Sequence, residues 1–145
     1  EIFTRFQFLN GDYLAQNKVD FSMQAVDTVL LLDANKILRV LQNLVNNAAE
    51  MFAQKGGRIT VVAREVEGGV EIAVADNGPG IPESVRTRLF EQFATAGKEK
   101  GLGLGLAICK SFVEAHGGSI RAETETGQGT TFFIRLPLPP PSGTP

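Results

Sequence analysis

Two stretches in the first half of the chain repeat apolar residues at helical spacing. The first covers residues 1–16, where Asn10-Gly11 allows an interruption. The second runs from Ala34 to about Gln54, with Asp33 placed to cap its start and Gly56-Gly57 placed to stop it. Because the second stretch keeps its apolar stripe throughout, we expect it to be the central helix.

Alternating or continuous apolar runs predict strands elsewhere in the chain. One pair precedes the central helix, and a second pair flanks Glu67-Gly68-Gly69, which is typical of the turn in an antiparallel hairpin. A third pair flanks Gly127-Gln128-Gly129. The expected strands cover residues 19–25, 28–32, 58–64, 70–75, 119–125 and 130–136.

The remaining segments complete a two-layer arrangement. We expect residues 82–93 to be helical in part, 94–100 to form a mobile loop, and 104–115 to form a helix. Segregated helices and a mixed, largely antiparallel sheet predict an α+β fold, with helices covering one face of the sheet. Residues 1–137 are expected to form one domain, and the proline-rich residues 138–145 a flexible tail.

The composition is that of one soluble globular domain. The chain has 145 residues, 43 % of them hydrophobic, and no run long and apolar enough to span a bilayer. Its net charge of −2 gives no field that would draw it to nucleic acid or anionic lipid. The single cysteine, Cys109, cannot form an intramolecular disulfide, which suits a reducing compartment. We therefore expect a cytoplasmic location without direct membrane contact, whether or not a parent protein is anchored in a membrane.

Asn43 and Asn47 lie four residues apart on the expected central helix, so their carboxamides share one face. Neither residue matches the apolar stripe. Paired asparagines on a helix surface are commonly only solvated. The alternative is that a carboxamide oxygen ligates Mg²⁺ while the phosphates of a nucleotide supply further ligands.

A segment rich in turn-forming residues, Asp76 to Ile81, directly follows an expected strand. An ordinary turn is one interpretation, because Asp, Asn, Gly and Pro all favour turns. The other is that Asp76 accepts a hydrogen bond from the exocyclic amine of a base, while Gly78 and Gly80 let the backbone come close to it. In that case the segment would recognise adenine.

Gly101, Gly103 and Gly105 alternate with leucines where a helix is expected to begin. Backbone N–H groups there, together with the helix dipole, could converge on phosphate oxygens. The segment fits neither a dinucleotide fingerprint nor a P-loop. Lys98 and Lys100 directly precede it and could pair with a terminal phosphate, although a short charge run is more often only solvated.

Taken in order, these segments resemble the nucleotide-binding boxes of histidine kinases, a branch of the GHKL ATPases that also includes gyrase and the mismatch-repair ATPases. Residues 41–48 resemble the N box, 76–81 the first glycine box and 89–93 the F box. Residues 101–108 resemble the second glycine box and 127–132 the third. The resemblance covers nearly the whole chain and implies the GHKL ATPase fold and the catalytic, ATP-binding domain of a bacterial sensor histidine kinase.

The resemblance assigns roles to individual residues. Asn43 and Asn47 would be catalytic, with Asn47 binding Mg²⁺ and Asn43 supporting it. Asp76 would hold the adenine amine directly or through water, and Thr130 would back that contact. The implied nucleotide-binding residues are Asn43, Asn47, Met51, Lys55, Asp76, Gly78, Gly80, Ile81, Phe93, Lys98, Gly101, Leu102, Gly103, Leu104, Gly105, Leu106 and Thr130.

Some positions depart from the family pattern. Met51 stands where many members have a tyrosine, so stacking on the base would be weaker or come from Phe52. Leu102 replaces the usual small or hydroxyl residue, so a side-chain contact with phosphate is lost there. Phe90 and Phe93 match the family, and they would anchor a lid formed by residues 94–100.

Asn43 also bears on the reaction. Hydrolytic relatives have a glutamate there as general base for water, whereas an amide cannot take up a proton. The resemblance therefore implies that the γ-phosphoryl group goes to a histidine on separate dimerisation and phosphotransfer helices, of the same or a partner chain, which indirectly serve a response regulator. His116, the only histidine here, ends a helix and is expected to be structural. The alternatives are a serine kinase of the anti-sigma-factor type, against which Asn43 counts, and a degenerate kinase that docks a partner.

Overall fold

The computed structural model describes most of the chain, namely residues 2–25, 33–52, 55–86, 89–90 and 102–138. Outside these residues lie the second expected strand, the expected loop, and all of the expected tail except Leu138. Within the described residues, no helix is long and apolar enough to cross a membrane.

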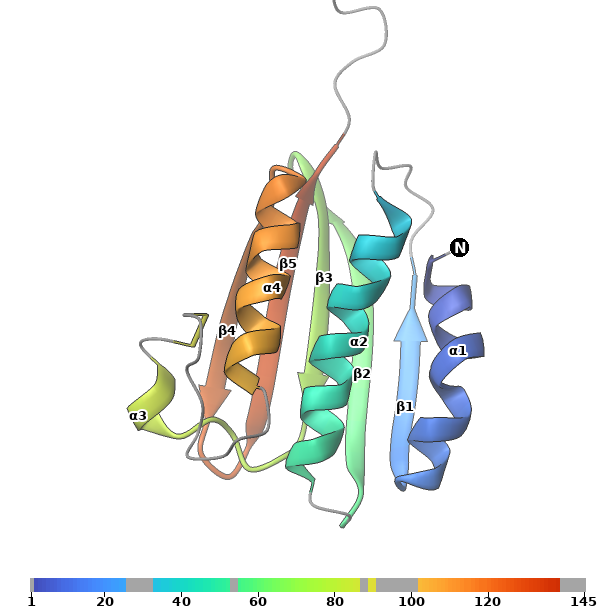
Figure 1. Ribbon diagram of the computed structural model, residues 1–145, viewed down its shortest axis with the longest axis vertical. Coiled ribbons are helices and arrows are strands. Elements are labelled where there is room, and N and C mark those ends of the chain that lie inside the picture. Colours follow the sequence, from blue (N-terminus) through green and yellow to red (C-terminus); the bar gives the residue numbers. More distant parts are fainter. Residues whose placement is uncertain (1, 26–32, 53–54, 87–88, 91–101, 139–145) are drawn as a thin grey trace, which may run out of the picture.

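Figure 1 shows the helices and strands of the described residues. Their bounds are α1 Ile2–Gln16, β1 Val19–Gln24, α2 Ala34–Met51, β2 Gly57–Val66, β3 Gly69–Asp76, α3 Glu83–Arg86, α4 Leu102–Ala115, β4 Ser119–Glu125 and β5 Gly129–Pro137.

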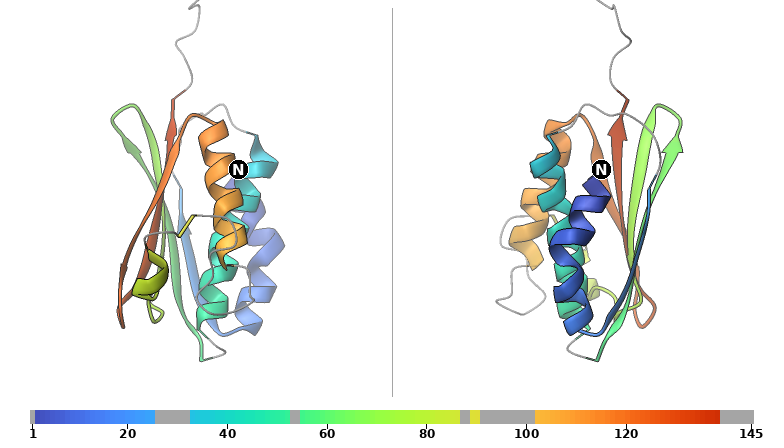
Figure 2. Two further views of the ribbon diagram at one scale, coloured as in Figure 1. Left: turned by 60° about the vertical axis from the view of Figure 1, so that its left-hand side comes forward. Right: turned by 90° about the vertical axis from the view of Figure 1, so that its right-hand side faces the viewer.

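The strands form one sheet in the order β1-β2-β3-β5-β4. β1 and β2 are parallel, because α2 carries the chain back between them, and the other neighbours are antiparallel. Figure 2 shows α1, α2 and α4 on the same face of this sheet. The predicted fold class, a two-layer structure with a mixed and largely antiparallel sheet, is confirmed.

The core lies between α2 and the covered face of the sheet. The apolar stripe of α2 is buried as expected, and Leu41 and Val45 are completely inaccessible to solvent. Ile59 and Val61 of β2 are equally buried on the sheet side. Asp33 caps the helix, since its side chain accepts a hydrogen bond from the Lys36 N–H at 3.3 Å.

α4 lies beside α2, and three of its residues hold it in the core. Leu106, Cys109 and Val113 have no exposed surface and recur at helical spacing. At the far end of α4, His116 Nε2 accepts a hydrogen bond of 2.9 Å from the Asp33 N–H. Its Nδ1 is then the protonated nitrogen, which donates to the Phe112 carbonyl at 2.8 Å. His116 thus joins the end of α4 to the start of α2.

Two helices differ from the sequence prediction, α1 and α4, whereas α3 agrees with it. α1 is not interrupted at Asn10-Gly11, because the Asn10 side chain is buried and donates to the Phe6 carbonyl at 3.0 Å. α4 begins at Leu102 rather than at residue 104, so Gly103 and Gly105 lie within its first turns. Within the expected partly helical stretch at 82–93, α3 accounts for four residues.

Candidate functional site

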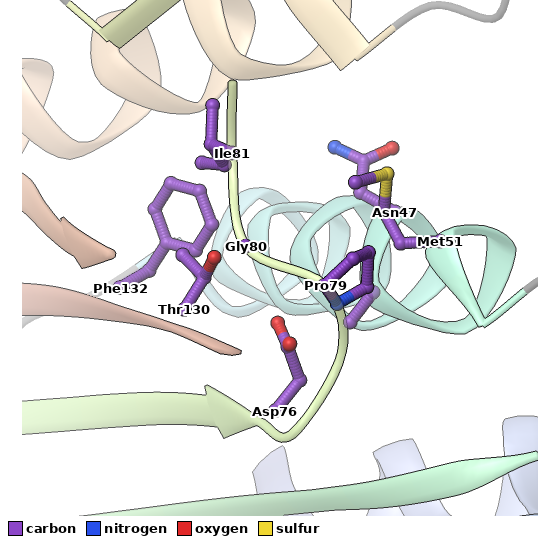
Figure 3. A pocket seen from close by; sticks show the side chains of 9 residues that line it. Asn47, Met51, Asp76, Pro79, Gly80, Ile81, Thr130 and Phe132 are labelled. Atoms are coloured by element: carbon purple, nitrogen blue, oxygen red, sulfur yellow. The ribbon is translucent and has the colours of Figure 1, made fainter. Parts of the chain in front are cut away.

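A pocket lies between α2, the turn that follows β3, and the start of β5 (Figure 3). It contains about 290 Å³ of empty space, part of which is open to solvent. Its lining residues come from segments far apart in the sequence and are Asn47, Ala48, Met51, Asp76, Pro79, Gly80, Ile81, Thr130 and Phe132.

Asp76 is the charged residue of this pocket, and it is the last residue of β3. Its Oδ1 accepts a hydrogen bond of 2.8 Å from the Gly78 N–H. Burial raises the pKa of the Asp76 carboxyl above its ordinary value, while the backbone N–H groups of Gly78 and Thr130 partly oppose that effect. A carboxylate can accept about four hydrogen bonds, so these two backbone donors leave it able to accept another from a ligand.

Two turns meet at the pocket, and glycines allow their close approach. Gly80 has φ +85°, and a Cβ there would lie 2.7 Å from the Glu125 carbonyl oxygen. Gly129 has φ +126°, and a Cβ there would overlap the Asp76 carbonyl oxygen. The Gly127 N–H donates to the Pro79 carbonyl at 2.9 Å. The turn after β3 and the β4–β5 hairpin thus form one connected wall.

Side chains that the sequence reasoning missed strengthen this wall. Thr124 Oγ1 accepts from the Ile81 N–H at 2.8 Å and lies 3.0 Å from Thr130 Oγ1. Arg86 donates to the Ile81 carbonyl at 2.9 Å and to Thr126 Oγ1 at 3.0 Å. No motif marks Thr124 or Arg86, because their partners are set by strand register and by the path of the turn.

The two asparagines of α2 occupy different environments. Asn47 lines the pocket, and its Nδ2 is buried without a hydrogen-bond partner among the described residues. Asn43 does not line the pocket but donates to Cys109 Sγ at 3.7 Å. Burial raises the pKa of Cys109 to about 11, so the thiol stays neutral and unreactive at physiological pH.

Several other predicted site residues lie at or near the pocket. Met51 and Ile81 line it, whereas Phe52 is buried away from it against Gly57 and Gly78. Of the two candidates for stacking on a base, Met51 is therefore the one in place.

Phe132 is a pocket residue that the sequence reasoning missed. Its ring meets Phe90 edge-on, with 6.3 Å between the ring centroids. Leu89 and Phe90 are the F-box residues that the structure describes, and Phe90 lies next to the pocket wall.

Other predicted residues that the structure describes do not line the pocket. Lys55 is exposed outside the lining, and Leu106 is completely buried in the core, where it anchors α4. The backbone of residues 102–105 forms the start of α4. Phe93, Lys98 and Gly101 lie outside the described residues, so their roles stay predictions.

Residues 32–140 match a protein-family model described as Histidine kinase-, DNA gyrase B-, and HSP90-like ATPase. The match covers most of the chain, and the chain therefore belongs to this family. An ATPase domain of this family accounts for both the two-layer fold and the Asp76 pocket at one end of the sheet.

Individual relatives are sensor proteins. Alginate biosynthesis sensor protein KinB of Pseudomonas aeruginosa is 44 % identical over 110 residues, which cover 75 % of this chain and 18 % of KinB. C4-dicarboxylate transport sensor protein DctB of Rhizobium meliloti is 48 % identical over 103 residues, which cover 70 % of this chain and 16 % of DctB. The chain thus spans less than a fifth of the length of either relative.

Solved structures show the same similarity. The catalytic domain of histidine kinase ThkA superposes with a TM-score of 0.81 at 31 % identity, covering 94 % of this chain and 90 % of that domain. The mycobacterial sensor histidine kinase MprB gives a TM-score of 0.78 at 29 % identity, covering 93 % and 95 % of the two chains. The predicted resemblance to histidine kinase catalytic domains is confirmed.

Proposed function

We propose that this chain binds Mg²⁺-ATP and donates the γ-phosphoryl group to a histidine on separate dimerisation and phosphotransfer helices, of the same or a partner chain, in two-component signalling. The observation that carries the proposal is the partly buried Asp76 carboxylate in a pocket that the Asn47 carboxamide also lines. Residues 1–137 would act as one domain on the cytoplasmic side, and residues 138–145 as a tail.

The base would bind against Asp76. A carboxylate only accepts hydrogen bonds, so it selects a ligand with a donor such as the adenine amine. Met51, Ile81 and Phe132 supply apolar surface in the same pocket. Family membership supports this role, because the family is one of ATPases.

Mg²⁺ would be held by Asn47. The side chain is half-buried, and its Nδ2 is buried without a partner among the described residues. Proteins rarely leave such a group unpaired, which supports a ligand at this position. Rotation about the last side-chain bond exchanges Nδ2 with Oδ1, so Asn47 can offer an oxygen, which is the ligand atom that Mg²⁺ prefers. Bound there, Mg²⁺ would neutralise charge on the nucleotide phosphates.

Asn43 would keep the phosphoryl group from water. Its amide cannot act as a general base, and its nitrogen is engaged with Cys109. The γ-phosphoryl group is then retained for a positioned nucleophile. The complex of ThkA with response regulator TrrA, which matches this chain with a TM-score of 0.76, supports a response regulator as the indirect partner.

Calorimetry and a phosphate-release assay test both parts of the proposal. We expect ATP to bind only weakly without Mg²⁺, and the isolated chain to release phosphate very slowly. Asn47→Ala should abolish most of the Mg²⁺ dependence, whereas Gln42→Ala, a half-buried α2 position outside the pocket lining, should not change it. Rapid phosphate release by the wild type would contradict the kinase assignment and favour a hydrolytic ATPase.

A further inference from the structure

Thr124 lies behind the pocket and contacts both turns that form its wall. Its hydroxyl oxygen accepts a hydrogen bond from the Ile81 N–H at 2.8 Å. The same oxygen lies 3.0 Å from Thr130 Oγ1 and 3.3 Å from the Gly129 carbonyl oxygen. Thr124 is not itself a lining residue, but two of its partners, Ile81 and Thr130, are.

The proton of the Thr124 hydroxyl has two competing acceptors. Thr130 Oγ1 is closer than the Gly129 carbonyl, and hydroxyl donors prefer distances well below 3.3 Å. If Thr124 donates to Thr130, the Thr130 hydroxyl keeps its own proton for the pocket. If Thr130 donated to Thr124 instead, the Thr130 oxygen could only accept hydrogen bonds in the pocket. Together with the Asp76 carboxylate, it would then offer a ligand acceptors alone.

The contact geometry points to Thr124 as a specificity-determining residue that acts through Thr130. We propose that the Thr124 hydroxyl donates to Thr130 and so makes the Thr130 hydroxyl a donor to the ligand, next to the acceptor Asp76. Figure 3 shows the Asp76 and Thr130 side chains at the same pocket, next to the turn that contains Pro79 and Gly80. Thr130 is 6 % exposed, so solvent has little access to reset its orientation.

An acceptor beside a donor matches one type of purine edge. The 6-amino group of adenine donates and its N1 accepts, whereas a 6-oxo purine accepts at O6 and donates from N1–H. The pair formed by Asp76 and Thr130 therefore favours 6-amino purines and opposes 6-oxo purines. This inference rests on the proposed function, because it concerns the base of the nucleotide bound in that same pocket.

The test compares the affinities for ATP and for inosine triphosphate, which carries a 6-oxo purine. Thr124→Val removes the hydroxyl and keeps the shape of the side chain, and Thr124→Ser keeps the hydroxyl. Thr131→Val is the matched control, because Thr131 follows Thr130 on β5 and faces the opposite side of the sheet. Thermal unfolding establishes that each variant is folded, and Thr124→Ala replaces Thr124→Val if that variant does not fold.

We expect the preference for ATP over inosine triphosphate to fall roughly three- to tenfold in Thr124→Val, as for one misdirected hydrogen bond. Thr124→Ser and Thr131→Val should keep the wild-type ratio within about twofold. An unchanged ratio in Thr124→Val, or an equal loss of both affinities, would overturn the inference, since the residue would then be only structural. A wild type that binds neither nucleotide would instead refute the proposed function.

Discussion

Asp76→Asn should separate ligand binding from folding, because the carboxylate has opposite effects on the two. In the folded chain, burial is the largest cause that raises the pKa of Asp76. A raised folded-state pKa means that this group contributes stability below its unfolded pKa and loses it as the pH rises through the folded pKa. At neutral pH the ionised group therefore opposes folding, and a neutral amide removes that cost.

The same substitution should weaken ATP binding. The amide oxygen can still accept a hydrogen bond from the Gly78 N–H, which lies 2.8 Å from Asp76 Oδ1 in the wild type. The amide nitrogen then replaces the other oxygen and presents a donor to the Thr130 N–H or to the adenine amine. A buried donor that faces another donor costs about 1–3 kcal/mol, which is roughly a 5- to 150-fold loss of affinity.

Calorimetry with ATP and GTP, beside thermal unfolding at pH 7, measures both effects. We expect ATP affinity to fall and GTP to gain relative to ATP. The melting temperature should change little, because the burial cost that the amide removes is offset by the mispaired Thr130 N–H. Asp20→Asn is the control, because Asp20 is an exposed β1 residue paired with Arg58 at 3.5 Å, away from the pocket. Unchanged ATP affinity in Asp76→Asn would show that Asp76 is only a turn residue, and a large loss of stability would refute the argument from burial.

Three further predictions concern the hairpin, the thiol and the phosphates. Gly129→Ala should lose roughly 3 kcal/mol of unfolding free energy in urea, because φ is +126° and the new Cβ overlaps the Asp76 carbonyl oxygen. Gly127→Ala has open space around the new Cβ and should lose only about 1 kcal/mol. Burial raises the pKa of the Cys109 thiol from 9.0 to about 11, so the thiol ionises first in the unfolded chain. Between pH 7.5 and 10, the wild type should therefore lose roughly 1–1.5 kcal/mol more unfolding free energy than Cys109→Val. Equal losses in parallel urea titrations would contradict this. Lys98→Ala should lower the ATP-to-ADP affinity ratio without changing base preference, and an unchanged ratio would leave Lys98 merely solvated.

Local sequence patterns were sufficient for most elements. The apolar stripe of α2, its Asp33 cap and the glycine turn between β2 and β3 depend on residues only a few positions apart. These short-range preferences act on each segment wherever it lies in the fold. The expected break at Asn10-Gly11 failed because a buried side-chain hydrogen bond within α1 outweighs the turn preference of these residues.

Tertiary structure decided the arrangement of the site. The sequence by itself marked Asp76, Asn47 and Thr130 as candidates, because their residue types and spacing resemble a known family. It did not reveal that Thr124 meets Ile81, 43 residues away, or that Asn43 meets Cys109, 66 residues away. Such contacts depend on strand order and register, which are settled only when the covered face of the sheet closes on α2 and α4. The sequence thus identifies which residues can bind a nucleotide, whereas the partner and direction of each hydrogen bond in the pocket are determined by the assembled fold.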